Sequence, residues 1–395
     1  MKYINASDKL PEALINQIKA YVDGVYIYIP RLEAKKRKWG SVSKSRREFD
    51  LRNERIYEAY LRGKSLQDLC DSYFLSDKSI RRILLQEKKK YEVEKMKIQN
   101  IVENWEVQGA IQQISACEWL IGHDHQIKIY KDLRRLKRSL AFLTSLREEG
   151  LLVPKIIPLV SGESYWQDGE GYYLMTSHLQ SEGLLEEMHL TTEWYYDFGQ
   201  TLGRLHLALK ACENKMSYWN NSLLEEMKGW VLEALEARGL DYLDLECLHK
   251  AIEELEAVND ALPRQLIHRN VFVGTFLYDA EGFKGYSNFD LGQGNIRLFD
   301  PCYFLLGLLS EGRVTTMEPE TWLTYVKATF EGYESLVGLS LQEKEAVVVV
   351  MKNIELLFIA YFIREDKEDQ AQEAYKIFSL VCELEEAILE TLRNL

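Results

Sequence analysis

The stretch LIHRNVFVGTFLYDAEGFKGYSNFDLGQGN, from Leu266 to Asn295, constrains the fold more than any other part of the chain. A short apolar run ends in His268, a loop follows, and a second run leads through Asp279 to Asn288-Phe289-Asp290. Short apolar runs bounded by turn residues indicate buried strands. The stretch is therefore predicted to be hairpin-like, and it interrupts a chain that has mainly helical periodicity from Thr191 onward.

The part of the chain before Thr191 has a different pattern of apolar residues. Three short alternating segments, which indicate strands, precede an amphipathic helix over 133–147, and two more strand-like segments follow it. These strand-like segments are Trp105–Cys117, Glu118–His123, His125–Tyr130, Val153–Pro158 and Tyr172–His178. A small lobe of strands with one helix (105–180), followed by a larger helical lobe (181–395), is the plan of an α+β two-lobed protein-kinase-like domain.

Residues from about 105 to 385 resemble the aminoglycoside phosphotransferase family, including its spore-coat-associated relatives. Leu266–Asp279 is similar to the family pattern LIHGDLHPGNILFD, and Ser287–Asp290 to IDFD. The remaining similar segments are the strand Gln126–Tyr130, the strand entry Gly150–Ile157, the helix Thr201–His206 and the helix start Arg297–Asp300. The spacing is kept throughout, so the resemblance implies the family's fold.

The resemblance also implies where the site residues lie, and several of them are altered. The position of the family's catalytic Asp is Asn270, whose neutral amide accepts no proton. The position of a magnesium-binding Asn is Thr275, and that of the metal-binding Asp is Asn288. Asp290, two residues later on the same strand face, is a possible displaced metal ligand. His268 is expected to play a structural part in its loop.

The small lobe lacks further parts of a phosphotransferase site. Lys128 is at the position of the phosphate-binding lysine, but the helix 133–147 offers it no Glu partner before Leu146. The segment 107–117 contains a single glycine where a phosphate-covering loop is expected. Because Mg²⁺ bound to phosphates normally requires one or two carboxylates, we expect a catalytically inactive, pseudokinase-like domain without a cofactor. The alternative is a divergent active enzyme that uses ATP or GTP with Mg²⁺.

The first hundred residues differ from the rest in charge. They contain 23 Lys and Arg against 14 Asp and Glu, a net charge of +9, so the remainder of the chain carries −22 of the total of −13. A basic segment on an acidic body suggests a nucleic-acid-binding end. A solvated charged surface is the simpler alternative.

A pattern within this segment supports binding to DNA. Ser65 can cap a short helix and Ser76 a second one, with apolar residues at helical spacing on the inward faces, which is the layout of a helix-turn-helix. Phe74 is at the turn, where many such motifs have glycine. Side chains expected to face DNA are Lys78, Ser79, Arg81 and Arg82. The alternative is a helical bundle used for protein contact.

Residues 1–90 as a whole resemble the Mor-type transcription activators. The similar segments are Gly24–Pro30 (GVYIYIP), Lys35–Gly40 (KKRKWG) and the pair of helices over 65–84. The resemblance implies an all-α helix-turn-helix domain and a homodimer. Residues 91–104 are charged and helix-prone, and we expect a helical linker there.

The sequence therefore predicts a multidomain, cytoplasmic, homodimeric transcriptional regulator that binds DNA and carries an inactive phosphotransferase-like domain. That domain is expected to bind a small-molecule ligand in its cleft or to serve as an interaction module. The alternatives are an active small-molecule phosphotransferase and a structural or spore-coat-associated scaffold protein. Six scattered cysteines without a CxxC pair indicate reduced thiols. The apolar stretch 346–363 contains charged residues and is read as a core helix rather than a membrane span.

Overall fold

The computed structural model describes residues 15, 43–61, 63–179, 191–272, 274–279, 282–310 and 312–395. The chain divides into two compact units, Met1–Val93 and Glu94–Leu395. Two of the segments that resemble the Mor-type activators, 24–30 and 35–40, lie outside the described residues.

Among its described residues, the first unit contains the helices α2 (Ser43–Leu61) and α3 (Leu66–Tyr73) and the larger part of α4 (Asp77–Val102). Ser65 caps α3 in a capping box with Asp68, as its sequence predicts. The helices pack around four buried side chains, Ile56, Leu69, Ile80 and Ile83. The two helices that the sequence predicts over 65–84 are therefore present with a short turn between them, whereas a helix-turn-helix domain that binds DNA stays a prediction.

The turn between α3 and α4 is made without a glycine. Phe74 ends α3 in the left-handed conformation, at φ 52°, and its side chain is 94% exposed. Only glycine adopts this region without steric cost. The turn thus has a left-handed residue at the position where many helix-turn-helix motifs have glycine, and the residue here is an exposed phenylalanine.

Helix α4 continues without a break through the predicted linker, and its last residues belong to the second unit. Ile98, Ile101 and Val102 are buried there. The following 3₁₀ turn η3 (Glu103–Trp105) places Trp105, whose Nε1 donates a hydrogen bond to the Ile157 carbonyl oxygen at 2.9 Å. The end of α4 is therefore an integral part of the small lobe.

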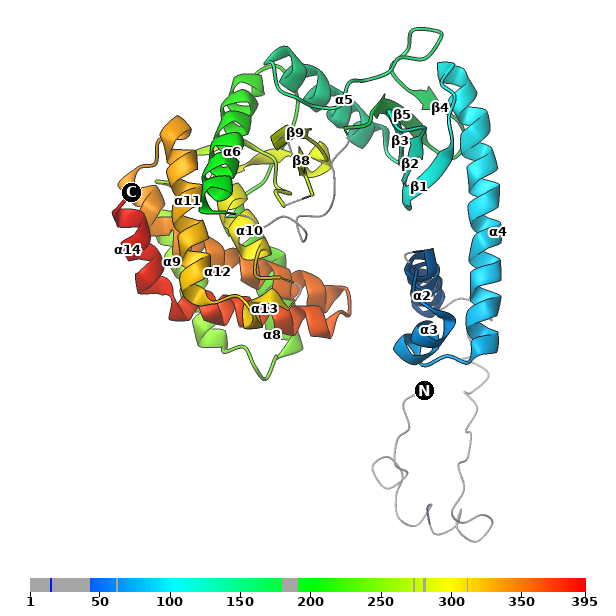
Figure 1. The fold of residues 1–395 in the computed structure, drawn as a ribbon. Coiled ribbons are helices and arrows are strands. Elements are labelled where there is room, and N and C mark those ends of the chain that lie inside the picture. The colour runs from blue at the N-terminus through cyan, green and yellow to red at the C-terminus, as the bar shows by residue number, and fades with distance from the viewer. Residues whose placement is uncertain are drawn as a thin grey trace. The chain divides into compact units, whose positions relative to one another are not determined.

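The small lobe is a five-stranded antiparallel sheet in the order β1-β2-β3-β5-β4, together with helix α5 (Leu133–Glu148; Figure 1). Its strands are β1 (Ile111–Ser115), β2 (Glu118–Ile121), β3 (His125–Tyr130), β4 (Trp166–Gln167) and β5 (Tyr172–Ser177). The predicted strand 105–117 was too long, because Trp105 belongs to η3 and β1 begins only at Ile111. The predicted strand 153–158 contributes a single bridge, at Ile156.

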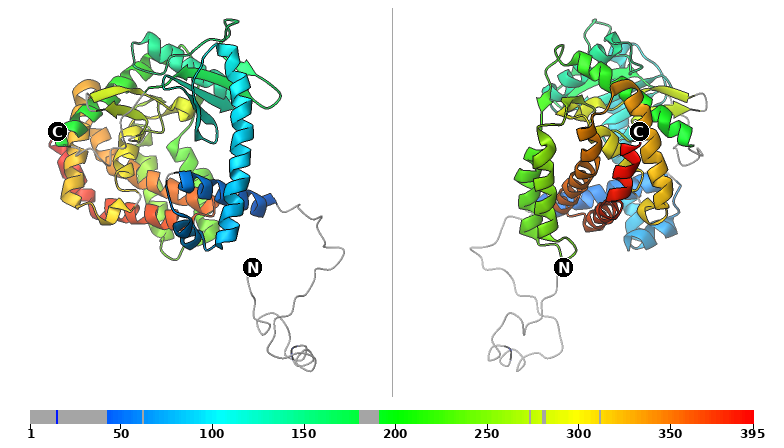
Figure 2. Two further views of the ribbon diagram at one scale, coloured as in Figure 1. Left: turned by 45° about the vertical axis from the view of Figure 1, so that its right-hand side comes forward. Right: turned by 90° about the vertical axis from the view of Figure 1, so that its left-hand side faces the viewer.

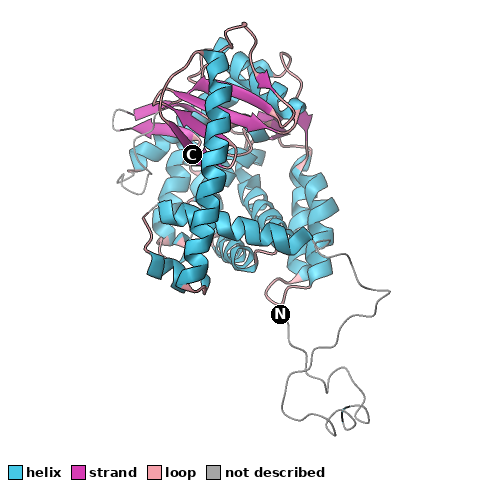
Figure 3. Ribbon diagram, turned by 90° about the vertical axis from the view of Figure 1, so that its right-hand side faces the viewer, coloured by secondary structure: helices cyan, strands magenta, loops and turns pink. Residues whose placement is uncertain are grey.

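The large lobe is mainly helical and also contains two small sheets (Figures 2 and 3). The sheets are β6-β10-β7 and β8-β9, formed by β6 (Trp219–Asn220), β7 (Arg264–Ile267), β8 (Phe276–Asp279), β9 (Gly282–Tyr286) and β10 (Gln293–Ile296). The helical elements are α6 (Thr192–Cys212), α7 (Leu223–Glu226), η4 (Met227–Val231), α8 (Leu232–Arg238), α9 (Leu245–Asn259), η5 (Phe289–Leu291), α10 (Phe299–Gly307), η6 (Arg313–Thr315), α11 (Pro319–Val337), α12 (Leu341–Arg364), α13 (Glu368–Glu383) and α14 (Glu385–Arg393).

Helix α12 is the central helix of this lobe. Among the described residues it alone is long and apolar enough to cross a membrane, and 72% of its apolar window is buried inside the protein. Its neighbours include α9, α10, α13 and α14. Burial in the core accounts for its apolar length, in line with the prediction of a core helix.

Candidate functional site

The two strands predicted for the Leu266–Asn295 stretch belong to different sheets. β7 pairs with β10, whereas β8 pairs with β9, so the loop between His268 and Thr275 crosses from one sheet to the other. The hairpin is thus β8-β9 alone.

The backbone of the loop is fixed by a buried carboxylate. Asp300, fully buried at the start of α10, accepts hydrogen bonds from the backbone N–H groups of His268 and Arg269, each at 2.8 Å. His206 from α6 lies 3.0 Å from the same carboxylate through Nε2. Asp300 thus positions the loop, because it is the buried acceptor that the two N–H groups require.

His268 has a structural role in this arrangement. Its Nε2 donates to the Ser287 carbonyl oxygen at 2.9 Å, and its Nδ1 accepts from the Asn270 backbone N–H at 3.3 Å. Burial lowers the pKa of His268 below its ordinary value, which outweighs the opposite effect of Asp300. A neutral ring therefore connects the two segments that contain the altered positions.

Thr275 is turned into the loop and away from solvent. Its hydroxyl donates to the Phe272 carbonyl oxygen at 2.8 Å and accepts from the Phe272 N–H at 3.0 Å. The side chain is fully buried. Both hydrogen-bonding functions of the hydroxyl are thus used locally, so Thr275 does not supply the ligand that an Asn at this position would offer.

Arg269 occupies a position at which the family pattern has glycine. Its φ is 66°, in the left-handed region, and its guanidinium is directed inward. The guanidinium forms an ion pair with Glu226 at 2.7 Å and lies 3.8 Å from the centre of the Phe299 ring. Burial lowers its pKa, although an Arg side chain stays charged. A cation is thus built into the loop next to Asn270.

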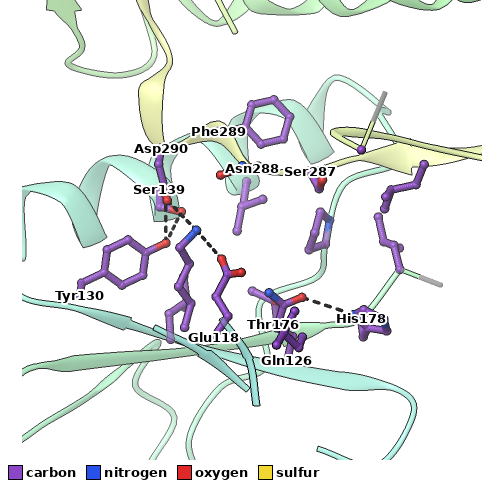
Figure 4. A pocket seen from close by; sticks show the side chains of 18 residues that line it. Glu118, Gln126, Tyr130, Ser139, Thr176, His178, Ser287, Asn288, Phe289 and Asp290 are labelled. Carbon is purple, nitrogen blue, oxygen red and sulfur yellow. Dashed lines mark hydrogen bonds and ion pairs between the residues drawn. The ribbon is translucent and has the colours of Figure 1, made fainter. Parts of the chain in front are cut away.

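A pocket of about 260 Å³ lies between the small lobe and the end of β9. Its polar centre is the Lys128 ammonium, 2.6 Å from Asp290 Oδ2 and 2.7 Å from Glu118 Oε1 (Figure 4). Asn288 also lines the pocket, in the left-handed conformation at φ 63°. The lysine that lacks a helix Glu therefore has two other acidic partners.

Helix α5 holds Asp290 from the other side. Arg138 donates to the Asp290 carbonyl oxygen at 2.9 Å, and the Tyr130 hydroxyl lies 3.0 Å from Ser139 and 3.3 Å from the Asp290 carboxylate. Burial, followed by repulsion from Asp290, raises the pKa of Tyr130 above its ordinary range. The helix face that would carry a Glu thus carries a cation and a hydroxyl.

The charges in the pocket sum to a negative value. Burial lowers the pKa of Lys128, but Asp290 and Glu118 outweigh this effect and raise it above its ordinary value, so the lysine is cationic. Two carboxylates around one ammonium leave one negative charge. A phosphate group must therefore compete with Asp290 and Glu118 for Lys128, and it meets their repulsion.

The β1–β2 turn contains no glycine. It consists of Ala116 and Cys117, and Gly109, the single glycine of the segment, packs against the backbone of Gly122 at the far end of the hairpin. A glycine-rich turn brings backbone N–H groups close to phosphates. The short turn here has no such sequence, as the prediction from 107–117 stated.

The predicted site residues fall into two groups. Lys128, Asn288 and Asp290 line the pocket, whereas His268, Asn270 and Thr275 belong to the hydrogen-bonded loop behind it. Sequence reasoning missed two residues. Glu118 could have been found, because it is directly opposite Lys128 in the β2–β3 hairpin, where opposite charges pair. Arg269 could also have been found, because it replaces the glycine that follows the histidine in the family pattern.

The donor set does not fit a magnesium ion. Among the described residues, no group of three His, Cys, Asp or Glu side chains could hold a metal. Asp290 is engaged by Lys128 and Tyr130, and the hydroxyl of Thr275 is turned away. The neutral amides of Asn270 and Asn288, together with the carboxylate of Asp290 that is already paired, lack the negative charge that Mg²⁺ usually requires.

In the first unit the residues predicted to contact DNA lie at the start of α4. Lys78 and Arg82 are exposed. Arg81 forms an i,i+4 ion pair with Asp77 at 2.8 Å, and Ser79 lies 3.0 Å from Ser76 at the helix start. Lys78 and Arg82 are therefore the better placed cations.

Comparison with known proteins identifies the larger unit. Residues 122–286 match the model of the phosphotransferase enzyme family. The second unit contains a domain of the phosphotransferase enzyme family. Solved structures agree: an aminoglycoside phosphotransferase from Alicyclobacillus acidocaldarius shares 17% identity at a TM-score of 0.54, and covers 73% of this chain and 93% of its own. At such identities the likeness establishes the two-lobed kinase-like fold.

Another solved relative of the domain contains a nucleotide. The structure of the amicoumacin kinase hAmiN in complex with AMP-PNP, Ca²⁺ and Ami matches at a TM-score of 0.55 and 14% identity, over 74% of this chain and 96% of that one. A Zymomonas mobilis homoserine kinase is 24% identical over 173 residues, which are 41% of this chain, and the match spans about half, 49%, of that kinase. The nucleotide is a ligand of that relative, and these comparisons do not support our expectation that the domain binds no cofactor.

One relative matches at higher identity over a short length. An 84-residue segment, 21% of the chain, is 43% identical to the uncharacterized protein YraL of Bacillus subtilis and covers 97% of that protein. This segment therefore belongs to the same family as YraL. The match adds no function, and the Mor-type resemblance stays a prediction.

Proposed function

We propose that the phosphotransferase-family domain binds a ligand in its interlobe pocket without efficient phosphoryl transfer, and that it regulates a DNA-binding helical unit. The ion-pair cluster of Lys128, Asp290 and Glu118 carries this proposal. It occupies the pocket from both lobes and joins β2, β3 and η5. The domain would then act as a sensor of the ligand that binds in this pocket.

The side chains around the loop support the proposal that phosphoryl transfer is inefficient. Asn270 cannot accept a proton from an acceptor hydroxyl, and loss of general-base catalysis alone costs about 10²–10⁴-fold in rate. Asn288 provides a neutral oxygen where a metal-binding carboxylate is expected. Because Asp290 is held by Lys128 and Tyr130, it would have to break both contacts to take over the metal.

The helical unit supplies the proposed output. Lys78 and Arg82 are exposed at the start of α4, where a recognition helix meets base edges and phosphates. Because α4 is one helix from Asp77 to Val102, its other end is packed into the small lobe. A ligand that moves the small lobe would act on the same helix. A homodimer and a cytoplasmic location are further parts of the proposal.

A divergent, active small-molecule phosphotransferase is the second candidate. Asp290 favours it, because this carboxylate lines the pocket beside a lysine on β3. The homoserine kinase and the amicoumacin kinase among its relatives also favour it. In this case Asp290 must leave Lys128 when Mg²⁺ and nucleotide bind.

Asp290→Asn separates the two candidates. If Asp290 only neutralises Lys128, its removal frees the ammonium, and metal-free ATP should bind the variant about tenfold or more tightly, as calorimetry would show. If Asp290 is a metal ligand, Asp290→Asn should weaken ATP–Mg²⁺ binding and abolish transfer to amino and hydroxylated acceptors. Lys137→Met, which changes an exposed lysine on α5, is the matched control.

Gel shifts test the DNA-binding part. Lys78→Ala and Arg82→Ala should each weaken binding by about 1–3 kcal/mol if a base contact is lost. Arg81→Ala should cost less, because Asp77 already pairs with it. Lys64→Ala, at an exposed lysine before α3, is the control. Binding should fall steeply with salt; an absence of affinity for duplexes at low salt contradicts the regulator proposal.

A further inference from the structure

The turn between α3 and α4 presents one apolar side chain to solvent while its neighbours pack inward. Tyr73 and Leu75 both pack against the buried core of the first unit. Phe74 lies between them in the sequence and is 94% exposed. The backbone N–H groups of Phe74 and Leu75 both donate to the Cys70 carbonyl oxygen. Hydrogen bonds therefore hold the turn that directs the ring of Phe74 outward.

The conformation of Phe74 acts against the stability of the folded chain. Its φ of 52° is in the left-handed region, where the β-carbon of an L residue crowds its own backbone. A single exposed apolar side chain is ordinary, but one that is also held in a strained conformation is not. Strained residues cluster at sites of function. Glycine would remove both the strain and the exposed ring, so folding of the chain does not account for this phenylalanine.

Exposed cations follow Phe74 in the sequence, at the start of α4. Lys78 and Arg82 are exposed. Asp77, the acid next to Lys78, is already paired with Arg81 at 2.8 Å. Residues 1–100 as a whole carry a net charge of +9. An apolar ring beside exposed cations fits a partner in which phosphates are next to apolar groups, and DNA is such a partner.

The position of the ring fits the major groove of DNA. A recognition helix places its N-terminal residues against base edges in this groove. Phe74 precedes Asp77, the first residue of α4, by three positions, so the ring lies at the end of the helix that would enter the groove. The thymine methyl group is the apolar group that base pairs present there, and phenylalanine is among the side chains that contact it. Such a contact would remove apolar surface of the ring from water.

We propose that Phe74 contacts the methyl group of a thymine in the major groove, and that it thereby selects a T·A pair at one position of the binding site. The inference rests on the proposed binding of DNA by the helical unit. Lys78 and Arg82 would attract the duplex and hold it. Phe74 would add discrimination between bases, which contacts to phosphate alone do not provide.

The experiment starts from a duplex that the full-length parent selects from a randomised pool. Each thymine of this duplex is then replaced in turn by deoxyuridine, which removes only the methyl group. At the contacted thymine the replacement should weaken binding by the parent about fourfold, the value expected for one buried methyl-sized group. The same replacement should leave binding by Phe74→Gly unchanged, because the ring that contacts the methyl group is absent.

Three variants separate the role of the ring from the stability of the fold. Phe74→Gly should bind the unmodified duplex about tenfold or more weakly, although it relieves strain, so unfolding cannot explain the loss. Phe74→Asn, with a polar side chain that tolerates the left-handed region, should behave in the same way. Phe49→Leu changes another exposed phenylalanine of the first unit, and it should leave both the affinity and the deoxyuridine effect unchanged.

Salt dependence distinguishes the ring from the cations. The fall of affinity with salt concentration should be equally steep for Phe74→Gly and the parent, because no phosphate contact is lost. The fall should be less steep for Lys78→Ala if this lysine contacts a phosphate.

Three results would overturn the inference. If Phe74→Gly binds the selected duplex as tightly as the parent does, the ring does not contact DNA, and the proposed DNA binding stands without it. If every deoxyuridine replacement affects the parent and Phe74→Gly equally, the ring contacts the DNA backbone or a protein instead of a thymine. If the parent selects no duplex at all, the proposed DNA binding fails, and this inference fails with it.

Discussion

Replacing Arg269 by glycine restores the residue that the family pattern has at this position, and the structure predicts that the protein becomes less stable. The change removes a left-handed non-glycine residue, which relieves about 1–2 kcal/mol of strain. It also removes the partner of Glu226. The arginine side chain is 11% exposed and the glutamate 18%, so both charges are largely buried.

Breaking a buried ion pair from one side costs about 3–5 kcal/mol, because the remaining charge is left without compensation. Subtracting the relieved strain leaves a net loss of about 1–4 kcal/mol for Arg269→Gly. Chemical denaturation of the second unit, followed by tryptophan fluorescence, measures it. Adding Glu226→Gln to Arg269→Gly should recover much of the loss.

The control is Glu106→Gly. Glu106 is exposed and also left-handed, at φ 52°, so this change relieves strain without breaking a pair and should stabilise the protein by about 1 kcal/mol. If Arg269→Gly stabilises the protein as much as Glu106→Gly does, the buried ion pair contributes nothing, and the account of a loop rebuilt around Arg269 is wrong.

Three further predictions concern single residues. Phe74→Gly should stabilise the α3–α4 turn by about 1 kcal/mol, seen as slower hydrogen exchange there, because the ring is exposed and only strain is lost; faster exchange would contradict this. Asp300→Asn should destabilise the protein by about 2–4 kcal/mol in denaturant titrations, because the carboxylate accepts two buried N–H groups and contacts His206; an unchanged midpoint would show that an amide suffices. The raised pKa of Glu355 means that the folded state binds a proton that the unfolded state has lost, so stability should fall as pH rises from about 4.5 to about 8, and Glu355→Gln should remove this slope.

The large-scale fold could be predicted from the periodicity of apolar residues along the sequence. Period-two and period-3.6 runs located the sheet of the small lobe, helix α5 and the helical lobe. The pair of helices α3 and α4 followed from Ser65, Ser76 and their apolar spacing. Strand ends were predicted less well. The predicted strand 105–117 begins only at Ile111, and 153–158 contributes a single bridge, because these segments have no neighbouring strand to pair with along their length.

The site could be predicted only in part, because the charge of the pocket depends on which side chains pair with one another in the folded protein. The altered positions Asn270, Thr275 and Asn288 were visible in the motif. The partners of Lys128 were not, since Asp290 lies 162 positions away and joins it only when the lobes meet.

The central claim, that the pocket has lost its magnesium site, is tested most directly by calorimetry of ATP binding with and without Mg²⁺. The parent should gain no affinity from Mg²⁺. The triple variant Asn270→Asp, Thr275→Asn, Asn288→Asp should gain about tenfold or more, since restored carboxylates repel each other until a cation binds. Mg²⁺-dependent micromolar binding by the parent would contradict the account and establish a nucleotide-binding domain with its metal site intact.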